Sequence, residues 1–551
     1  MTTCGLSAPA VAASRHSASR QFEHGGDRHH GFGTFLWPGN LLISRSVYEN
    51  DPNNIVPGVT LLPAGCAPAN CVKATTNAAY PFVFNNDTVD SSFGITSKIF
   101  LDQLTPWGHR ISTLEVPSSA QWGVGPSSDQ MVTSFSSKSE IALNLSTSGR
   151  YVTFMGYLAP IEALDVSNSN TQGVVDPTNP VTVAYYRVVA QLDRWGRFHF
   201  TLTNAYSGNN GRAAILNDKH GSGVLYTSGN AGNGGNPQPD GIILGAGAQI
   251  LSPSYAPEAV QSPGTPTPVG SFNVTQLGDK ADKIGKDTNF RGLTIHDNVV
   301  YYTKGSGGNG VNTVYFVDTT GTACPNGSGV PAPGAPLPTS PIAYDPALLQ
   351  TQGVTPYNMC VLNGFPTVLA KNDTTFFPFG LWFANSHTLY VSNEGDGTNT
   401  FSTTTGTYTP AAAQTTSGLQ KWVLNGNAWQ LAYTLQSGLN LGQPYTVPGY
   451  PTGNNPTTGL PWAPATDGLR NITGRVGGYR DGKVTIWGVT STVSGSGDQG
   501  ADPNKVVAIT DDVGATTPSA GESFQTVKAA ASGEVLRGVS FTPDTESDRG
   551  W

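Results

Sequence analysis

A chain of 551 residues with 67 Gly, 40 Pro and only 12% charged residues has the composition of turn-rich β-structure, which excludes a mainly helical fold. One hydrophobic core rarely serves a chain of this length, so we expect several domains or a repeat architecture with several small cores. The formal charge of −8 and the lack of a Lys/Arg cluster argue against nucleic acid as a partner. The sequence has no run of eighteen apolar residues, so no membrane span is predicted.

The first residues, 1–36, are predicted to be a leader outside the folded domain. They contain the small-residue stretch LSAPAVAAS but lack the basic start and the continuous apolar core of a complete signal peptide. A truncated signal or a disordered tail fits this pattern. Residues 37–546 are predicted to form a single domain.

The cysteines indicate an oxidising compartment. Cys66 and Cys71 close a short loop, CAPANC, and Cys324 and Cys360 can join the ends of one long insertion, so two disulfides are predicted. A secreted or periplasmic location follows from this interpretation. The alternative is a cytosolic protein with free thiols.

A short phrase recurs at the start of successive β-segments along the chain. It reads NGRA at Arg212, FRGL at Arg291, PFGL at Phe379, LRNI at Arg470 and LRGV at Arg537, with SEIA at Glu140 as a divergent copy. Successive copies lie 72, 79, 88, 91 and 67 residues apart. Repetition at such intervals, with each copy opening a run of strand-like segments, is typical of a β-propeller.

Five complete blades of four strands can be followed in chain order. Their segments are EIALNLS, RYVTFMGY, VAYYRVVAQLD and FHFTLT; RAAILND, GVLYTSG, DGIILGAG and AQILSPS; RGLTIHD, VVYYTKG, NTVYFVDT and MCVLNG; FGLWFAN, TLYVSNEG, LQKWVLNG and WQLAYTLQ; and ITGRVGG, KVTIWGVTS, KVVAITDD and FQTVKAA. Asp297-Asn298 and Asn425-Gly426-Asn427 supply tight turns. The Pro-, Gly- and Ser-rich stretches 254–285 and 325–358 are predicted to be loops, although a seventh blade in one of them is an alternative.

The two ends of the chain supply a sixth blade. RGVSFTP at Arg537 has only a short tail behind it, whereas NLLISRS, SKIFLDQLT and HRISTLEVP near the N-terminus lack an inner partner. Joining these strands closes the ring and leaves no open sheet edge. The sequence therefore predicts an all-β, six-bladed propeller of antiparallel blades, acting as a monomer.

Several segments resemble the secreted bacterial β-propeller proteins of unassigned function, which also occur beside nuclease or surface-attachment modules. They are SEIALNLSTSGRYVTFMGY, RVVAQLDRWGRFHFTLTNAYSGNNGRAA, SGLQKWVLNGNAWQLAYTLQ and EVLRGVSFTP, and the resemblance covers roughly residues 37–543. It implies the fold and export from the cell. It assigns no catalytic residue.

The inner strand of each blade lines the axis of a propeller, so the recurring phrase should place its arginines at the mouth of the channel. The predicted ligand-binding residues are Arg212, Arg291, Phe379, Arg470 and Arg537. Four guanidinium groups around one mouth suit a carboxylate, sulfate or phosphate, which Arg binds with a planar fork.

A structural role for these arginines is the competing interpretation. Repetition in every blade is typical of a packing motif, and an inner-strand Arg can bind carbonyls or acids of the next blade. Glu140 should lie between Arg212 and Arg537, as their counter-ion or as a catalytic residue. Because flanking cations favour the carboxylate form, a catalytic Glu140 would suit a general base better than an acid.

Acidic loops after two second strands suggest a calcium site on the same face. The predicted ligands are Glu394, Asp396, Asp498 and Asp502, because carboxylates beside backbone and Asn carbonyls suit a hard cation. Solvated acidic turns are the alternative. No cofactor is required by this interpretation, and calcium is a candidate.

The leading functional hypothesis is an exported propeller that recognises an anionic or sugar-containing ligand at its channel mouth. Turn tryptophans, among them Trp107, Trp195 and Trp429, are candidates to stack on sugar rings. The alternative is an extracellular hydrolase or lyase for phosphate esters, lactones or acidic polysaccharides, with an Arg-lined site that calcium assists. A scaffold that contacts cell-surface or protein partners is the third hypothesis.

Overall fold

The chain divides into two units, Met1–Gly33 and Thr34–Trp551, and the description below concerns the second. In this computed structural model the described residues are 34–48, 59, 61–62, 72–73, 75–76, 84–85, 95–118, 130–135, 137–163, 166–171, 183–219, 223–230, 247–253, 269–271, 273–274, 289–306, 310–324, 327–338, 358–373, 375–456, 458–477, 482–496 and 500–545. Thr34 to Leu36, which we had assigned to the leader, belong to this unit. Leu36 is buried, and its amide donates to the Arg194 carbonyl at 2.8 Å.

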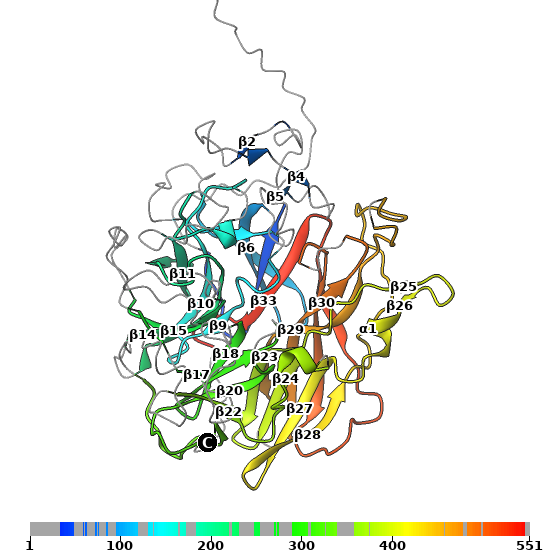
Figure 1. The fold of residues 1–551 in the computed structure, drawn as a ribbon. Helices are drawn as coiled ribbons and strands as arrows, with labels where there is room; N and C mark the ends of the chain where they lie inside the picture. Colours follow the sequence, from blue (N-terminus) through cyan, green and yellow to red (C-terminus); the bar gives the residue numbers. More distant parts are fainter. Residues whose placement is uncertain are drawn as a thin grey trace, which may run out of the picture. The chain divides into compact units, whose positions relative to one another are not determined.

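Six small sheets form the second unit (Figure 1), and we number the blades by their inner strands. Blade 1 is β9 (Asn144–Leu145), β10 (Tyr151–Tyr157), β11 (Arg187–Asp193) and β12 (Phe198–Thr203); blade 2 is β13 (Gly211–Asn217), β14 (Val224–Gly229), β15 (Ala248–Leu251) and β16 (Val269–Ser271); blade 3 is β18 (Phe290–His296), β19 (Val299–Lys304), β20 (Thr313–Asp318) and β22 (Asn358–Leu362), with β17 (Asn273–Val274) and β21 (Ser328–Gly329) paired to β22.

The other three blades follow the same order. Blade 4 is β23 (Pro378–Asn385), β24 (Thr388–Asn393), β27 (Gly418–Asn425) and β28 (Ala428–Leu435); blade 5 is β29 (Ala465–Val476), β30 (Lys483–Val493), β31 (Lys505–Asp512) and β32 (Gln525–Ala529); blade 6 is β33 (Glu534–Phe541), β1 (Leu41–Val47), β6 (Thr96–Leu104) and β7 (Arg110–Glu115), with β8 (Thr133–Ser134) paired to β6.

Short elements lie outside these blades. They are β2 (Leu61–Leu62) with β3 (Val72–Lys73), β4 (Thr75–Thr76) with β5 (Phe84–Asn85), β25 (Phe401–Ser402) with β26 (Thr407–Tyr408), helix α1 (Thr409–Ala413), and the 3-10 turns Val166–Asn168 and Ala370–Asn372.

The blades are arranged in a closed ring. In order around it, β10 contacts β13, β13 contacts β18, β18 contacts β23, β23 contacts β29, β29 contacts β33 and β33 contacts β9. The main strands of each blade pair antiparallel, and hydrophobic clusters fill the space between neighbouring blades. The predicted six-bladed β-propeller is therefore confirmed.

Closure of the ring joins the two ends of the chain. β1 pairs antiparallel with β33, from Leu41 opposite Phe541 to Val47 opposite Glu534, and β6 and β7 complete the blade. This arrangement confirms the predicted sixth blade. It also gives both β33 and β1 a hydrogen-bonded neighbour, which an open sheet edge would lack.

The strand assignment in blade 2 was wrong in part. AQIL forms the third strand, β15, and the fourth strand is β16, within the stretch 254–285 that we had predicted to be a loop. The segment DGIILGAG lies at 240–247, and all of it except Gly247 falls outside the described residues. β17 and β21 also lie in stretches predicted as loops. These strands are two or three residues long, too short for an alternating apolar pattern to reveal them.

Contacts between neighbouring inner strands explain why the recurring phrase often carries Gly. A Cβ at Gly292 would overlap the Phe379 carbonyl oxygen of the next blade, and a Cβ at Gly380 would lie 2.7 Å from the Arg470 carbonyl oxygen. The inner strands approach too closely there for a side chain.

A hydroxyl group on the second strand repeats at five of the six blade junctions. It donates to a main-chain carbonyl in the phrase of the next blade or, at Ala214, directly after it, and the pairs are Thr153 with Ala214, Ser228 with Arg291, Thr303 with Phe379, Ser392 with Arg470, and Ser44 with Ile141. The phrase therefore binds the ring together through its glycine and its backbone.

Among the described residues, no helix is long and apolar enough to cross a membrane.

Candidate functional site

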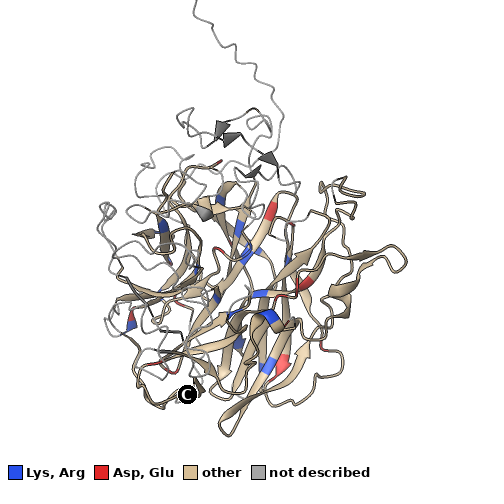
Figure 2. Ribbon diagram, in the orientation of Figure 1, with Lys and Arg blue, Asp and Glu red and all other residues tan. Residues whose placement is uncertain are grey.

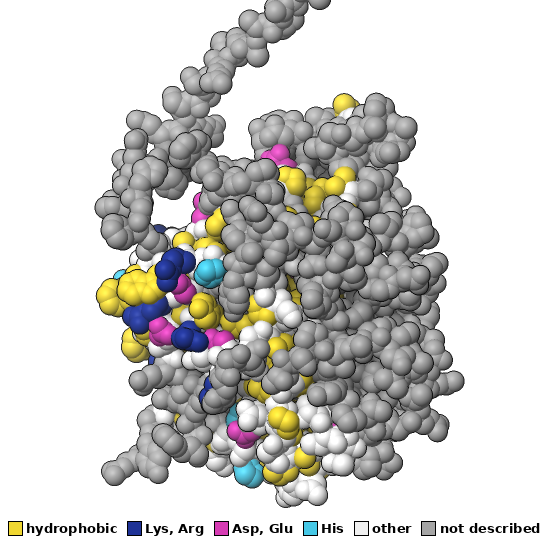
Figure 3. All heavy atoms as spheres, turned by 90° about the vertical axis from the view of Figure 1, so that its left-hand side faces the viewer, with side chains coloured by type: hydrophobic (Ala, Val, Ile, Leu, Met, Phe, Trp, Pro, Cys, Tyr) yellow, Lys and Arg dark blue, Asp and Glu magenta, His cyan; other side chains and the backbone are white. Residues whose placement is uncertain are grey.

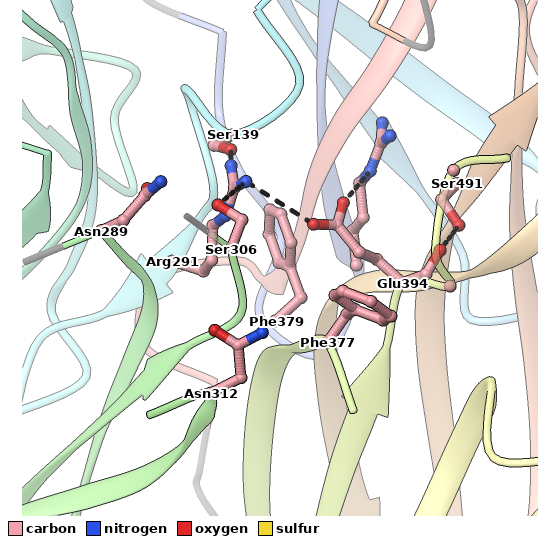
Figure 4. A network of polar contacts seen from close by, with 12 residues as sticks. Ser139, Asn289, Arg291, Ser306, Asn312, Phe377, Phe379, Glu394 and Ser491 are labelled. Atoms are coloured by element: carbon pink, nitrogen blue, oxygen red, sulfur yellow. Dashed lines mark hydrogen bonds and ion pairs between the residues drawn. The ribbon is translucent and has the colours of Figure 1, made fainter. Parts of the chain in front are cut away.

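Glu394 lies between two of the predicted arginines (Figure 4). It follows β24 directly, and its carboxylate Oε2 accepts a hydrogen bond from Arg470 Nε at 3.1 Å. Arg291 Nη2 lies 3.7 Å from Oε1. Arg291 also donates to the hydroxyl groups of Ser139 and Ser306. Residues from blades 3, 4 and 5 can meet in this way only near the axis of the ring.

The charge of Glu394 is fixed by its neighbours. Burial alone would raise the pKa of this carboxyl group, but attraction to Lys138, Arg291 and Arg470, together with the hydrogen bond from Arg470, lowers the pKa to about 2. Glu394 is therefore ionised throughout the physiological pH range. It is a resident anion within a group of cations.

Arg212 extends this group to blade 2, and no carboxylate of the described residues lies at ion-pair distance from it. Its Nη1 donates to the Asn289 side chain and to the Phe290 carbonyl oxygen, at 2.8 Å in the second case. Burial lowers the pKa of Arg212 well below its ordinary value, repulsion from Arg291 lowers it further, and attraction to Glu394 opposes both effects. Burial also lowers the pKa of Arg291. Repulsion from Arg291 therefore disfavours the charged form of Arg212.

Lys138, in the segment before blade 1, is a fourth cation that the sequence analysis missed. Attraction to Glu394 raises its pKa, but burial and repulsion from Arg291, Arg470 and Arg212 outweigh that attraction and lower the pKa to about 8. The side chain is half-buried. We call Lys138, Arg212, Arg291, Arg470 and Glu394 the axial cluster.

Phe379 takes the Arg position of the phrase in blade 4. It is buried, and the Arg291 guanidinium carbon lies 5.8 Å from the centre of its ring, a cation–π distance. Phe377 is half-buried and lies beside Glu394 in Figure 4. Aromatic rings thus border one side of the axial cluster. Figure 2 shows Lys and Arg residues on the strands in the middle of the view.

Glu140 is held by groups other than the arginines predicted to flank it. Its carboxylate accepts hydrogen bonds from Thr133 Oγ1 at 2.8 Å, from the Ser134 amide at 3.0 Å and from the Tyr157 hydroxyl. The next residue, Ile141, has a φ of 52°, so the chain turns away from the extended path of the other inner strands. Glu140 is fully buried. The amino-acid sequence does not predict this bend, because Ile rarely adopts a positive φ.

Arg537 binds main-chain carbonyl groups. Its Nη2 donates to the Phe135 carbonyl and, at 3.4 Å and 3.2 Å, to those of Ser134 and Gly500. These carbonyls belong to segments that flank blade 6 on either side. The contacts fit the structural alternative for this arginine and separate it from the axial cluster.

The structure does not gather the predicted calcium ligands that it describes. Asp396 is exposed, and its Oδ1 accepts from the Thr398 amide at 2.8 Å. Asp502 is fully buried and accepts from the hydroxyls of Tyr450 and Ser494, both at 2.8 Å. Asp498 lies outside the described residues.

Within the described part of the chain, one group of three potential metal ligands has its ligand atoms within 4.8 Å of one another: Asp318, Cys324 and Cys360. Its two cysteines form a disulfide, with Cα atoms 6.2 Å apart, and so carry no thiolate for a metal. This disulfide confirms the predicted pairing. Cys66 and Cys71 lie outside the described residues, and calcium binding stays a prediction.

Asp467, in β29, is a second residue that sequence reasoning missed. Burial raises its pKa to about 7, aided by repulsion from Asp396 and Glu394, and hydrogen bonds from the Gly397 amide and the Gln414 side chain oppose the rise. Those bonds are each 2.8 Å long. Asp467 therefore anchors the loop that follows Glu394.

The turn tryptophans differ in exposure. Trp107 is 87% exposed and Trp195 is 54% exposed, whereas Trp429 is buried. Figure 3 shows one side of the molecule, on which described hydrophobic side chains lie beside Lys, Arg, Asp and Glu. Two of the predicted sugar-stacking residues thus remain open to solvent.

No protein-family model and no curated protein matches this chain. The fold is shown by the ring of sheets alone, and the resemblance to secreted bacterial propeller proteins stays a prediction.

Proposed function

We propose that this protein is an exported β-propeller that recognises the anionic group of a ligand at the axial cluster. One observation carries the proposal: Arg470 and Arg291 lie 3.1 Å and 3.7 Å from the ionised Glu394 carboxylate, and Lys138 and Arg212 are attracted to the same carboxylate. Glu140 adds a second carboxylate near Arg212, and positive charge is still in excess. A buried excess of charge attracts a counter-ion because the low dielectric strengthens the interaction.

Ring assembly explains only part of what the arginine side chains of the axial cluster do. Arg212 donates to the Phe290 carbonyl of blade 3 and Arg470 pairs with Glu394 of blade 4, but blade 4 keeps the glycine and main-chain contacts of the ring with Phe379 in the Arg position. If the side chain served only packing, repetition of its positive charge would bring repulsion without benefit. A ligand that neutralises the charge supplies the benefit. This argument covers Arg212, Arg291 and Arg470, and it excludes Arg537, whose contacts are structural.

The geometry fits ligand recognition better than a hydrolase or lyase reaction. Glu140, the predicted catalytic residue, is fully buried and its carboxylate already accepts three hydrogen bonds. A general base must reach the proton that it removes. The Cys324–Cys360 disulfide supports the exported part of the proposal, because disulfides persist in oxidising compartments.

Isothermal titration of the full chain tests the proposal. Uronic-acid oligosaccharides and phosphate monoesters should bind, and neutral glycans of the same length should not. Arg212→Gln should weaken binding by about tenfold or more, since a charged donor is lost. Arg197→Gln is the matched control, because the Arg197 side chain is 69% exposed and pairs with Asp193 on the surface.

Two results would contradict the proposal: equal binding of neutral and anionic ligands, or an Arg212→Gln variant with wild-type affinity for anions. A parallel thermal-shift series with calcium or a chelator tests the calcium prediction, because an ion that binds only the native state must raise the melting temperature.

A further inference from the structure

Arg212 and Arg291, on the neighbouring inner strands β13 and β18, each carry an unused hydrogen-bond donor. Within the described part of the chain, the Nε atom of each side chain is buried and has no hydrogen-bond partner. The two residues are only 5% and 4% exposed. A buried donor without a partner is costly, so such atoms mark places where a ligand or water completes the structure.

No carboxylate group pairs with both guanidinium groups among the described residues. Arg212 donates to Asn289 and to the Phe290 carbonyl, and the nearest carboxylate of Arg291 is Glu394 at 3.7 Å. Attraction to Glu394 therefore offsets the burial of Arg212 and its repulsion from Arg291 only in part. An oxyanion there would satisfy both Nε atoms and remove the repulsion, because guanidinium groups bind such anions through parallel hydrogen bonds.

Glu394 restricts which anions can bind beside it. Its negative charge repels a second anion, and among the described residues Arg470 donates a hydrogen bond of ordinary length to it, at 3.1 Å. An ionised carboxylate offers about four acceptor positions, so acceptor capacity remains on Glu394. A hydroxyl group on the ligand can donate to it and offset the repulsion.

We infer that the anionic group binds between Arg212 and Arg291 while Glu394 accepts a hydrogen bond from a neighbouring hydroxyl of the same ligand. The ligand class is then a hydroxylated acid, as in acidic sugars, rather than a simple anion. This inference rests on the proposed function. Asn289 and Ser306, which accept from Arg212 and Arg291, are half-buried, so solvent reaches the partners of both arginines. Phe377 is also half-buried, and its ring offers an apolar face to the carbon skeleton of such a ligand.

The test compares two acids of similar size by titration: galacturonate, and cyclohexanecarboxylate, which has the carboxylate without hydroxyls. The wild-type chain should prefer galacturonate by about tenfold, the value of one charge-assisted hydrogen bond. Glu394→Met removes the acceptor and should reduce this preference to about twofold, while cyclohexanecarboxylate binds more tightly because a negative charge has gone. Asp396→Asn, which changes an exposed carboxylate two residues away, should keep the wild-type preference.

Each outcome points to a different part of the argument. An unchanged preference in Glu394→Met overturns the role of Glu394 but leaves the anion site intact. If the Arg212→Met variant binds both acids with the affinity of the wild-type chain, the anion does not bind beside Arg212. Failure of the wild-type chain to bind either acid, together with failure of the longer anionic ligands, overturns the proposed function itself.

A crystal structure of the wild-type chain with galacturonate decides the matter if the Glu394 variant does not fold. The carboxylate should lie within hydrogen-bond distance of Nε of Arg212 and Arg291, and a hydroxyl should lie within that distance of Glu394. Any other placement of the sugar acid overturns the inference.

Discussion

Arg470 and Glu394 lie 76 residues apart in sequence and in different blades, yet Arg470 Nε donates to Glu394 Oε2 at 3.1 Å with both side chains buried. The pair joins the inner strand of blade 5 to the end of the second strand of blade 4. Its acid had been predicted as a calcium ligand and its base as an anion ligand. Each of them already has the other as a partner.

Replacing Glu394 should destabilise the protein in a pH-dependent way. Its pKa is about 2 in the folded chain and near 4.5 in an unfolded one, so its stabilising effect is present above about pH 4.5 and is lost as the pH falls toward 2. Glu394→Gln should lower the free energy of unfolding by roughly 3 kcal/mol at pH 6 and by less than half of that at pH 3. Urea denaturation at the two pH values measures this difference. A constant difference would contradict the predicted ionisation.

Anion binding should weaken between pH 7 and pH 9 because Lys138 loses its proton. With a pKa of about 8, Lys138 is charged below this value and neutral above it. The affinity of the wild-type chain should fall severalfold over this range. Lys138→Arg keeps its charge and should show a flat profile, and Lys138→Met should bind weakly at both pH values. A pH profile shared by all three chains would rule out Lys138 as its source.

Asp467 should make the protein less stable as the pH rises from 5 to 8. Its pKa is raised to about 7, so the folded chain holds a proton that the unfolded chain releases near pH 4. Stability is therefore greatest below pH 4, declines as the pH rises toward 7, and is constant above it. Melting temperatures of the wild-type chain and of Asp467→Asn should be most similar near pH 4 and should separate as the pH increases, because only the wild-type chain loses stability. A constant difference in melting temperature between the two chains would show that the pKa of Asp467 lies outside this pH range.

Gly292→Ala should destabilise the ring. The new methyl group would overlap the Phe379 carbonyl of the next blade, so we expect a loss of roughly 2–3 kcal/mol in the free energy of unfolding. Gly514→Ala is the control, because the nearest atom to its Cβ is a flexible carboxylate oxygen at 3.5 Å. Chemical denaturation of both variants provides the comparison. Equal stabilities would mean that the inner strands can separate without cost.

The ring was predictable because its contacts repeat in sequence. Each copy of the phrase starts an inner strand, and Gly292 and Gly380 recur where neighbouring inner strands touch. The short strands β16 and β17 were not predictable, since two or three residues carry no period and their partners come from elsewhere in the chain. The prediction of secondary structure failed for strands that form because a distant strand pairs with them, rather than because of a local residue pattern.

The site was predictable only in part. Arg212, Arg291 and Arg470 share a place in the repeat, so their convergence followed from the fold. Lys138 lies outside the phrase, in a segment with no repeat to align it. Glu140 occupies the phrase position, but the positive φ of Ile141 bends the chain there, and hydroxyl and amide groups replace the expected arginines as its partners.

The pairing of β1 with β33 has a consequence for synthesis on the ribosome. Arg45 and Glu534, which form an ion pair across these strands, are 489 residues apart. At roughly 5–20 residues per second, β1 emerges some 25–100 s before its partner exists. Until then β1 lacks the strand that pairs with its inner edge in the folded chain. This interval is the time in which a chaperone, or a strand of another chain, has access to that edge.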